Sequence, residues 1–214
     1  MRVLIVAPAL EAGAADAGAV ELTRILKHAG HHAIVVSNAG RLVADINAAG
    51  AEFVPLNVAT ANPVRILRNV FALWRLAREK HCDAIHALGR SGAWSALVAA
   101  RLTRLPFLTS WYKGFRDQNL FKHLYNGVMA RGDRVVAVSE QLAQLVNDRY
   151  GTAWDRISVV PCSVDLERFD PERMTQARID AVRHAWGVTG ETKVILVVGR
   201  ILRQIGRASC RERV

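Results

Sequence analysis

The chain of 214 residues is poor in cysteine, has no long apolar run and carries fewer acidic than basic residues. Only Cys82 and Cys162 lie outside the last ten residues, and two cysteines in a chain of this size argue for a reducing compartment. No apolar run is long enough to span a bilayer, and Val3–Val6 is too short for the core of a signal peptide. These absences exclude a disulfide-rich secreted domain and predict a cytoplasmic protein.

Lysine and arginine outnumber aspartate and glutamate by 29 to 19, which gives a formal net charge of +10. A basic excess of this size predicts an anionic partner. The basic residues are scattered along the chain and match no nucleic-acid-binding signature, so we expect no nucleic acid among the partners. A phosphorylated sugar donor, an anionic membrane surface and an ordinary solvated basic surface all remain open.

What the chain does contain is 51% hydrophobic residues, grouped in short apolar runs that alternate with helical patterns. Strands are predicted at residues 2–7, 33–37, 52–56, 83–87, 107–111, 134–138 and 157–160. Helices are predicted at 18–29, 41–49, from 63 through 77, 91–102, 120–130 and 139–150. This alternation predicts an α/β fold with a doubly wound parallel sheet and helices on both of its faces.

Local signals mark several of the predicted helix ends. Gly30 and Gly50 follow their helices, where a glycine commonly adopts the left-handed conformation that ends a helix. Asn62 and Pro63 are typical of the N-cap and the first helical position. Ser139 is interpreted as another N-cap, followed by an acid that compensates the helix dipole.

A second α/β unit is predicted after the sheet. Residues 1–164 are expected to form the first domain, and residues 165–191 a connector with a helix over about 171–186. Lys193–Val198 then predicts a fresh buried strand that enters a turn at Gly199. Such a unit needs a helix and a further strand to close its layer. Residues 192–204 are therefore interpreted as the start of a truncated second domain.

The last ten residues, 205–214, differ in character from the rest of the chain. They resemble the translation of a common short-read sequencing adapter in a single reading frame, so we predict that they are a foreign tail. The segment carries three arginines and one glutamate, and without it the net charge is +8.

In a doubly wound sheet, ligands bind outside the carboxyl ends of the strands. The loop after the first predicted strand contains Gly13 and Gly18, and glycines there allow close backbone approach to an anion at a helix N-terminus. The loop has neither the G-x-G-x-x-G spacing of a dinucleotide site nor the Lys-Ser/Thr of a P-loop. A plain turn therefore stays open as the alternative.

Two further strand ends carry candidate residues. His86 lies at the end of the fourth predicted strand, and residues 111–116, with Tyr112 and Lys113, follow the fifth. Aromatic rings stack on the apolar faces of sugars and cations pair with phosphate, so the second loop suits a sugar or a phosphate. The alternatives are a hydrogen-bonded strand histidine and a solvated basic loop with an aromatic anchor.

Several motifs occur in a recognisable order along the chain. They are Gly13-Ala14-Ala15-Asp16, Ala29-Gly30-His31, Asp83–Ala87, Ala130–Glu140, Val159–Pro161, Val164–Phe169 and Val198–Arg200. As an ordered set they resemble the N-terminal, acceptor-side half of a family-four glycosyltransferase of the GT-B type, from Met1 to Gln204. The first motif departs from the family pattern, Gly-Gly-x-Glu, at its second glycine and at its acid.

The resemblance implies two Rossmann-like domains that face each other across a cleft, the first holding mainly the acceptor and the second the nucleotide-sugar. It implies a retaining transferase that needs no metal or other cofactor. Gly13, Asp16 and His86 would line the donor and acceptor cleft, and Arg200 would pair with the donor diphosphate. The family often carries a histidine after the fifth strand. Because Tyr112 and Lys113 stand there instead, these two are the catalytic candidates.

The resemblance also implies a function for the parent protein: transfer of a sugar from a nucleotide-sugar to a glycan or lipid-linked acceptor, in bacterial lipopolysaccharide or other surface polysaccharide synthesis. The protein would act in the cytoplasm, peripherally at the inner face of the cytoplasmic membrane. The chain of 214 residues, which lacks most of a donor pocket, is expected to be inactive. The alternatives are a non-enzymatic module that binds an anionic glycan or membrane surface, and another nucleotide-dependent Rossmann enzyme such as an epimerase or dehydrogenase.

Overall fold

The computed structural model describes residues 1–115, 119–163, 166, 169–189 and 191–196. The chain divides into two units, residues 1–163 and residues 164–214, each of which is described by itself. The predictions made for Arg200 and for the tail at 205–214 lie outside the described residues.

Unit 1 is built on a seven-stranded sheet in the order β3-β2-β1-β4-β5-β6-β7. Its strands are β1 Arg2–Val6, β2 His32–Ser37, β3 Glu52–Pro55, β4 Ala84–Ala87, β5 Phe107–Trp111, β6 Arg134–Ala137 and β7 Ile157–Val159. All neighbouring strands pair in parallel, and the order reverses between β1 and β4. The doubly wound parallel sheet expected from the alternation is confirmed.

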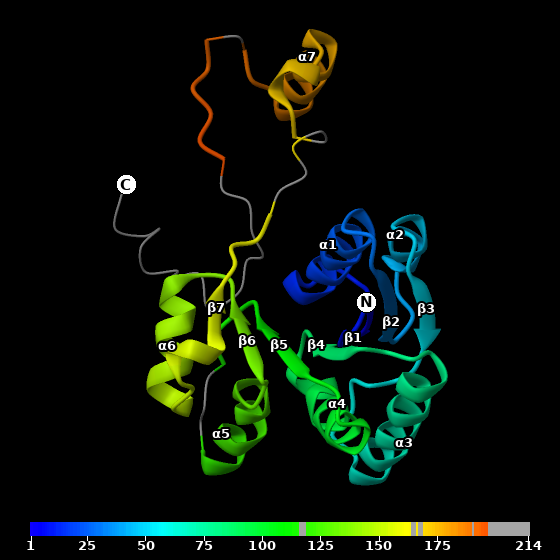
Figure 1. Ribbon diagram of the computed structural model, residues 1–214. Helices are drawn as coiled ribbons and strands as arrows, with labels where there is room; N and C mark the ends of the chain where they lie inside the picture. Colours follow the sequence, from blue (N-terminus) through cyan, green and yellow to red (C-terminus); the bar gives the residue numbers. More distant parts are fainter. Residues whose placement is uncertain (116–118, 164–165, 167–168, 190, 197–214) are drawn as a thin grey trace. The chain divides into compact units, whose positions relative to one another are not determined.

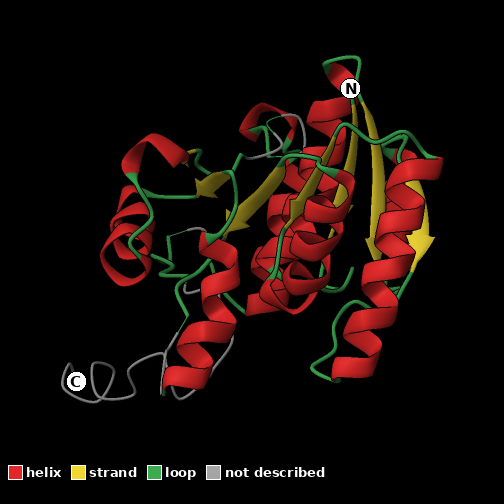
Figure 2. Cartoon of the chain, turned by 60° about the horizontal axis from the view of Figure 1, so that its bottom comes forward, coloured by secondary structure: helices red, strands yellow, loops and turns green. Residues whose placement is uncertain are grey.

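Helices cover both faces of the sheet (Figures 1 and 2). They are α1 Ala14–His28, α2 Val43–Ala48, α3 Pro63–Glu79, α4 Arg90–Thr103, α5 Leu120–Asn126 and α6 Glu140–Tyr150, with the 3₁₀ helices η1 Gly127–Ala130 and η2 Trp154–Arg156. Buried side chains of α1 and α2 pack on one face, while those of α3, α4 and α6 pack on the other. This division follows from right-handed crossovers that proceed outward from β1 in two directions.

The hydrophobic core has two parts because successive residues of a buried strand point to opposite faces. In β1, Leu4 and Val6 join the cluster under α3, α4 and α6, whereas Val3, Ile5 and Ala7 join the cluster under α1 and α2. Both faces of this strand are therefore apolar. That is why the N-terminal segment appears in the sequence as a continuous apolar run.

The predicted cap of α3 is confirmed, since the side chain of Asn62 accepts hydrogen bonds from the backbone N–H groups of Val64 and Arg65, and Pro63 is the first helical residue. Ser139 caps α6 in the same way, through the N–H of Leu142.

Two helix boundaries differ from the prediction. Helix α1 begins four residues earlier than expected, at Ala14, because the side chain of Asp16 caps it at Gly13. The helix predicted over 120–130 is α-helical only to Asn126 and continues as η1. There the side chains of Thr109 and Trp111 both donate to the carbonyl of Met129, which fixes η1 against β5.

Unit 2 contains η3 Pro171–Arg173 and α7 Gln176–Trp186 among its described residues. The single helix predicted over 171–186 is wrong in part, because two extended residues, Met174 and Thr175, separate the two pieces. The strand predicted at Lys193–Val198 is not found over 193–196, and its last two residues lie outside the described range. A strand exists only through pairing, and no described strand pairs with this segment.

Candidate functional site

The carboxyl ends of β1, β4 and β5 lie side by side at one edge of the sheet, because these strands are parallel neighbours. The sheet order reverses between β1 and β4, and this switch point is where α/β sheets form their ligand crevice. Helix α4 begins there at Arg90, directly after Gly89. A methyl group on Gly92 would lie 2.7 Å from a methyl of Val6, so this glycine lets α4 pack closely against β1.

The start of α1 contains the predicted residues Gly13 and Asp16. The backbone N–H of Gly13 donates to Asp16 Oδ2 at 2.9 Å, and the carboxylate is only 6% exposed. A methyl group on Gly13 would lie 2.9 Å from the same oxygen, so any larger residue there would require the Asp16 carboxylate to shift. The carboxylate already compensates the positive end of the helix dipole. Asp16 therefore shapes this loop, and a role for the two residues in the cleft stays a prediction.

The two predicted loops converge where Tyr112 meets α1. Any side chain on Gly18 would overlap the hydroxyl and ring of Tyr112, so the phenol lies directly against the first turns of the helix. Burial, together with the nearby Cys162 thiol, raises the pKa of Tyr112 to about 12. The phenol therefore keeps its proton at neutral pH, so it can donate a hydrogen bond to an anionic oxygen and cannot serve as a base.

Lys113 follows Tyr112 and is exposed. Residues 114 and 115 continue the loop, and Arg116, which the sequence analysis grouped with it, lies outside the described residues. The loop is anchored by aromatic contacts: the ring of Phe115 lies 5.0 Å from that of Trp111, and the guanidinium of Arg90 lies 4.9 Å above the Phe115 ring. A rigid anchor directly after Lys113 limits how far its backbone can move.

His86 is held inside the sheet. Its Nε2 lies 2.8 Å from the hydroxyl of Ser110 on β5, and the histidine is 7% exposed. Burial lowers the pKa of His86 to about 4, so the imidazole is neutral at physiological pH. This is the hydrogen-bonded strand histidine that the sequence analysis kept as an alternative. The structure places it beside β1 and β5, at the penultimate position of β4.

The sequence analysis missed Ser37, which lies at the carboxyl end of β2 next to the same edge. Its side chain is fully buried, and its hydroxyl has no hydrogen-bond partner in the part of the chain that the structure describes. Buried hydroxyls are normally satisfied, so this one is a candidate ligand contact. The sequence did contain a signal for this residue, because a serine ends the apolar run of the second predicted strand.

Within the described residues, no group of three or more His, Cys, Asp or Glu side chains is arranged to hold a metal ion. Over the same residues, no helix has the length and apolar character needed to cross a membrane.

Comparison with known proteins gives a consistent result. The family model of Glycosyltransferase Family 4 matches residues 16–168. A D-inositol 3-phosphate glycosyltransferase of Nocardiopsis dassonvillei is 28% identical over 137 residues, which cover 58% of this chain and 30% of that protein. The chain therefore spans less than a third of this relative.

Solved structures share the fold. A glycosyltransferase from Rickettsia africae is 30% identical with a TM-score of 0.77, over 89% of this chain and 50% of that one. Anabaena HepE, crystallised with UDP-glucose, is 18% identical with a TM-score of 0.69, over 87% of this chain and 50% of its own. The chain corresponds to about half of each of these structures.

Proposed function

Because the chain belongs to Glycosyltransferase Family 4, we propose that the protein transfers a sugar from a nucleotide-sugar donor to a glycan or lipid-linked acceptor. The observation that carries this proposal is the family match over residues 16–168, which includes both Gly18 and Tyr112. The UDP-glucose complex of HepE supports a nucleotide-sugar donor. The inositol-phosphate glycosyltransferase supports a polar, hydroxyl-bearing acceptor.

The chemistry that this edge of the sheet supplies is electrostatic. Sugar transfer requires stabilisation of the departing diphosphate, and fixed donors and cations aimed at that charge supply much of it. The protonated phenol of Tyr112 and the ammonium of Lys113 are adjacent in sequence at this edge. We assign them to oxygens that carry negative charge in the transition state. Neutral His86, hydrogen-bonded to Ser110, positions β4 and β5 beneath them.

We extend the proposal to three finer points: the reaction retains the anomeric configuration, it needs no metal, and it serves the synthesis of lipopolysaccharide or another bacterial surface polysaccharide. Such an acceptor places the protein at the inner face of the cytoplasmic membrane. The net charge of +8 that remains without residues 205–214 supports peripheral contact with anionic lipid there.

The test is a transfer assay with protein expressed from the source gene, resequenced across the codons for Arg203 to Gly206. We expect release of nucleoside diphosphate from a nucleotide-sugar such as UDP-glucose, unaffected by EDTA, with a product whose anomeric configuration matches the donor by NMR. Lys113→Gln should lower kcat by about tenfold, in line with the loss of one charge-assisted contact. Lys122→Gln, an equal change of charge on α5, should leave kcat unchanged.

Two results would overturn the proposal. One is the absence of diphosphate release with every nucleotide-sugar tried. The other is saturable NAD binding, which would instead favour the epimerase or dehydrogenase alternative.

A further inference from the structure

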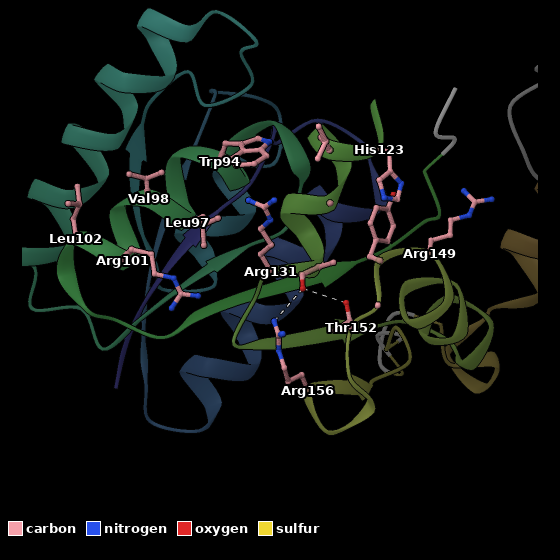
Figure 3. A pocket seen from close by; sticks show the side chains of 15 residues that line it. Trp94, Leu97, Val98, Arg101, Leu102, His123, Arg131, Arg149, Thr152 and Arg156 are labelled. Carbon is pink, nitrogen blue, oxygen red and sulfur yellow. Dashed lines mark hydrogen bonds between the residues drawn. The ribbon is translucent and has the colours of Figure 1, made fainter. Parts of the chain in front are cut away.

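A second site lies at the opposite edge of the sheet from Tyr112. A cavity of about 820 Å³ is bordered by α4 from Trp94 to Leu102, by the segment 123–131 of α5 and η1 ahead of β6, and by residues 149–156 ahead of β7 (Figure 3). These segments lead into strands, so they belong to the amino-terminal edge, whereas Gly13 and Tyr112 follow strand ends. The cavity has the size of a small-molecule site. It is not the transferase crevice.

The lining of this cavity, which we call the arginine pocket, is strongly basic. Arg101, Arg131, Arg149 and Arg156 border it, and no acidic residue does. Among the described residues only Arg101 has a carboxylate partner, Asp133 at 3.2 Å. The other three guanidinium groups next to the cavity therefore have no carboxylate partner among the described residues.

The partners of these three groups are neutral and hold them in place. Arg131 lies over the ring of Trp94 at 5.2 Å. Arg149 donates to the carbonyl of Phe115 at 3.0 Å. Arg156 donates to the carbonyls of Ala130 and Gly132, the first of which Figure 3 shows as a dashed line. A guanidinium held by neutral partners can still bind an anion. The planar arrangement of its N–H donors matches two oxygens of a phosphate group.

The rim of the arginine pocket is apolar and open to solvent. Val98, Leu102 and Leu124 line it with exposed fractions of 41%, 56% and 57%. One turn before Leu124 on α5, Leu120 and Phe121 are 80% and 84% exposed. Single exposed apolar residues are common, but a group of them around arginines without a carboxylate partner marks an interaction surface. The half-buried Trp94 adds the aromatic character typical of a membrane interface.

We propose that the arginine pocket binds the phosphate headgroup of an anionic phospholipid, while the apolar rim enters the acyl boundary of the bilayer. Charge complementarity selects the phosphate, and the exposed leucines select an amphiphile over a free phosphate ion. The inference extends the proposed function by naming the surface through which the protein would contact the membrane. It does not depend on sugar transfer, because vesicle binding requires neither donor nor acceptor.

The experiment is co-sedimentation of the full chain with phosphatidylcholine vesicles, with and without phosphatidylglycerol. Binding should require phosphatidylglycerol, and Arg131→Gln should weaken it about fivefold, the effect of one interfacial arginine. Leu124→Ser should also weaken it. The matched controls are Arg24→Gln and Ile25→Ser on α1, which packs on the other face of the sheet and should leave binding unchanged.

Several outcomes would overturn the inference. Equal weakening by Arg24→Gln would show that only net charge acts. Titration with inorganic pyrophosphate separates the two sources of phosphate: tight pyrophosphate binding lost in Arg131→Gln, without vesicle binding, would assign the pocket to a soluble ligand. If the protein transfers no sugar but binds vesicles through the arginine pocket, only the transferase proposal is refuted. If it transfers sugar but does not bind vesicles in this way, only the present inference is refuted.

Discussion

At the scale of single residues, the candidate site shows which roles a sequence can reveal. The glycine loop and the Tyr112 loop were both predictable, because each follows a buried strand. Their direct contact at Gly18 was not, because nothing in the sequence gives the distance between two loops 94 residues apart. Asp16 was predicted as a cleft residue, and the structure shows the helix cap that its short spacing from Gly13 also permitted.

The contact between Gly18 and Tyr112 gives a test of packing. Gly18→Ala should destabilise unit 1 by about 1–3 kcal/mol through overpacking, which exceeds the gain of ~1 kcal/mol in helix propensity. Urea unfolding measures the change. Gly127→Ala is the control, because its added methyl group would meet Tyr150 at an ordinary 3.5 Å. Equal stability of Gly18→Ala and the unmodified chain would mean that the Tyr112 ring moves freely.

His86 gives a test of pH dependence. Its pKa in the folded chain is about 4, below the ordinary value of 6.5, so the unfolded chain binds more protons between these two values. The contribution of His86 to the free energy of unfolding has its full value above about pH 6.5. It is lost as the pH falls towards 4, by up to ~1.4 kcal/mol per pH unit. Unfolding free energies measured across this window should show a flatter slope in His86→Gln. The exposed His28→Gln should keep the slope, and a His86→Gln variant that also kept it would contradict the assignment.

At the scale of elements, strands and caps were predictable and helix interruptions were not. The predicted strand at 107–111 and the Asn62 cap agree with the structure because both depend on local sequence signals. The change from α5 to η1 depends on Thr109 and Trp111, which approach Met129 only in the folded sheet. The strand expected at 193–198 was inferred from apolarity alone, and apolarity does not supply the neighbour that a strand needs.

The cap of α3 should have a measurable effect on stability. Asn62→Ala removes the acceptor for two backbone N–H groups and should cost about 1 kcal/mol in the free energy of unfolding. Asn47→Ala, at an exposed position on α2 with no cap role, should change stability by less than ~0.5 kcal/mol. Denaturant titrations of the two variants decide the point, and equal effects would mean that α3 is held by packing alone.

At the scale of the whole molecule, the core belongs to unit 1. All described buried hydrophobic residues lie between Val3 and Val146, and β7 adds the partly buried Ile157 and Val159. The described part of α7 buries no residue.

A chain that ends at Ser163 should therefore keep the fold. Its melting temperature should lie within about 2–4 °C of that of the full chain, a difference of roughly 1 kcal/mol for a domain of this size. A chain that ends at Tyr150 loses β7 and should melt clearly lower. Differential scanning calorimetry distinguishes the cases, and a large loss on removing residues 164–214 would show that unit 2 contributes to the core.

The two thiols of unit 1 have a practical consequence. Cys162 is exposed and close enough to Tyr112 to affect its pKa, whereas Cys82 is buried with its pKa raised to about 11. Because the thiolate is the reactive form, a maleimide at neutral pH should modify Cys162 far faster than Cys82. A chain that ends at Ser163 would thus accept a single fluorophore or spin label beside the candidate site without any engineered cysteine. Its emission or line shape would report on occupancy of that site directly.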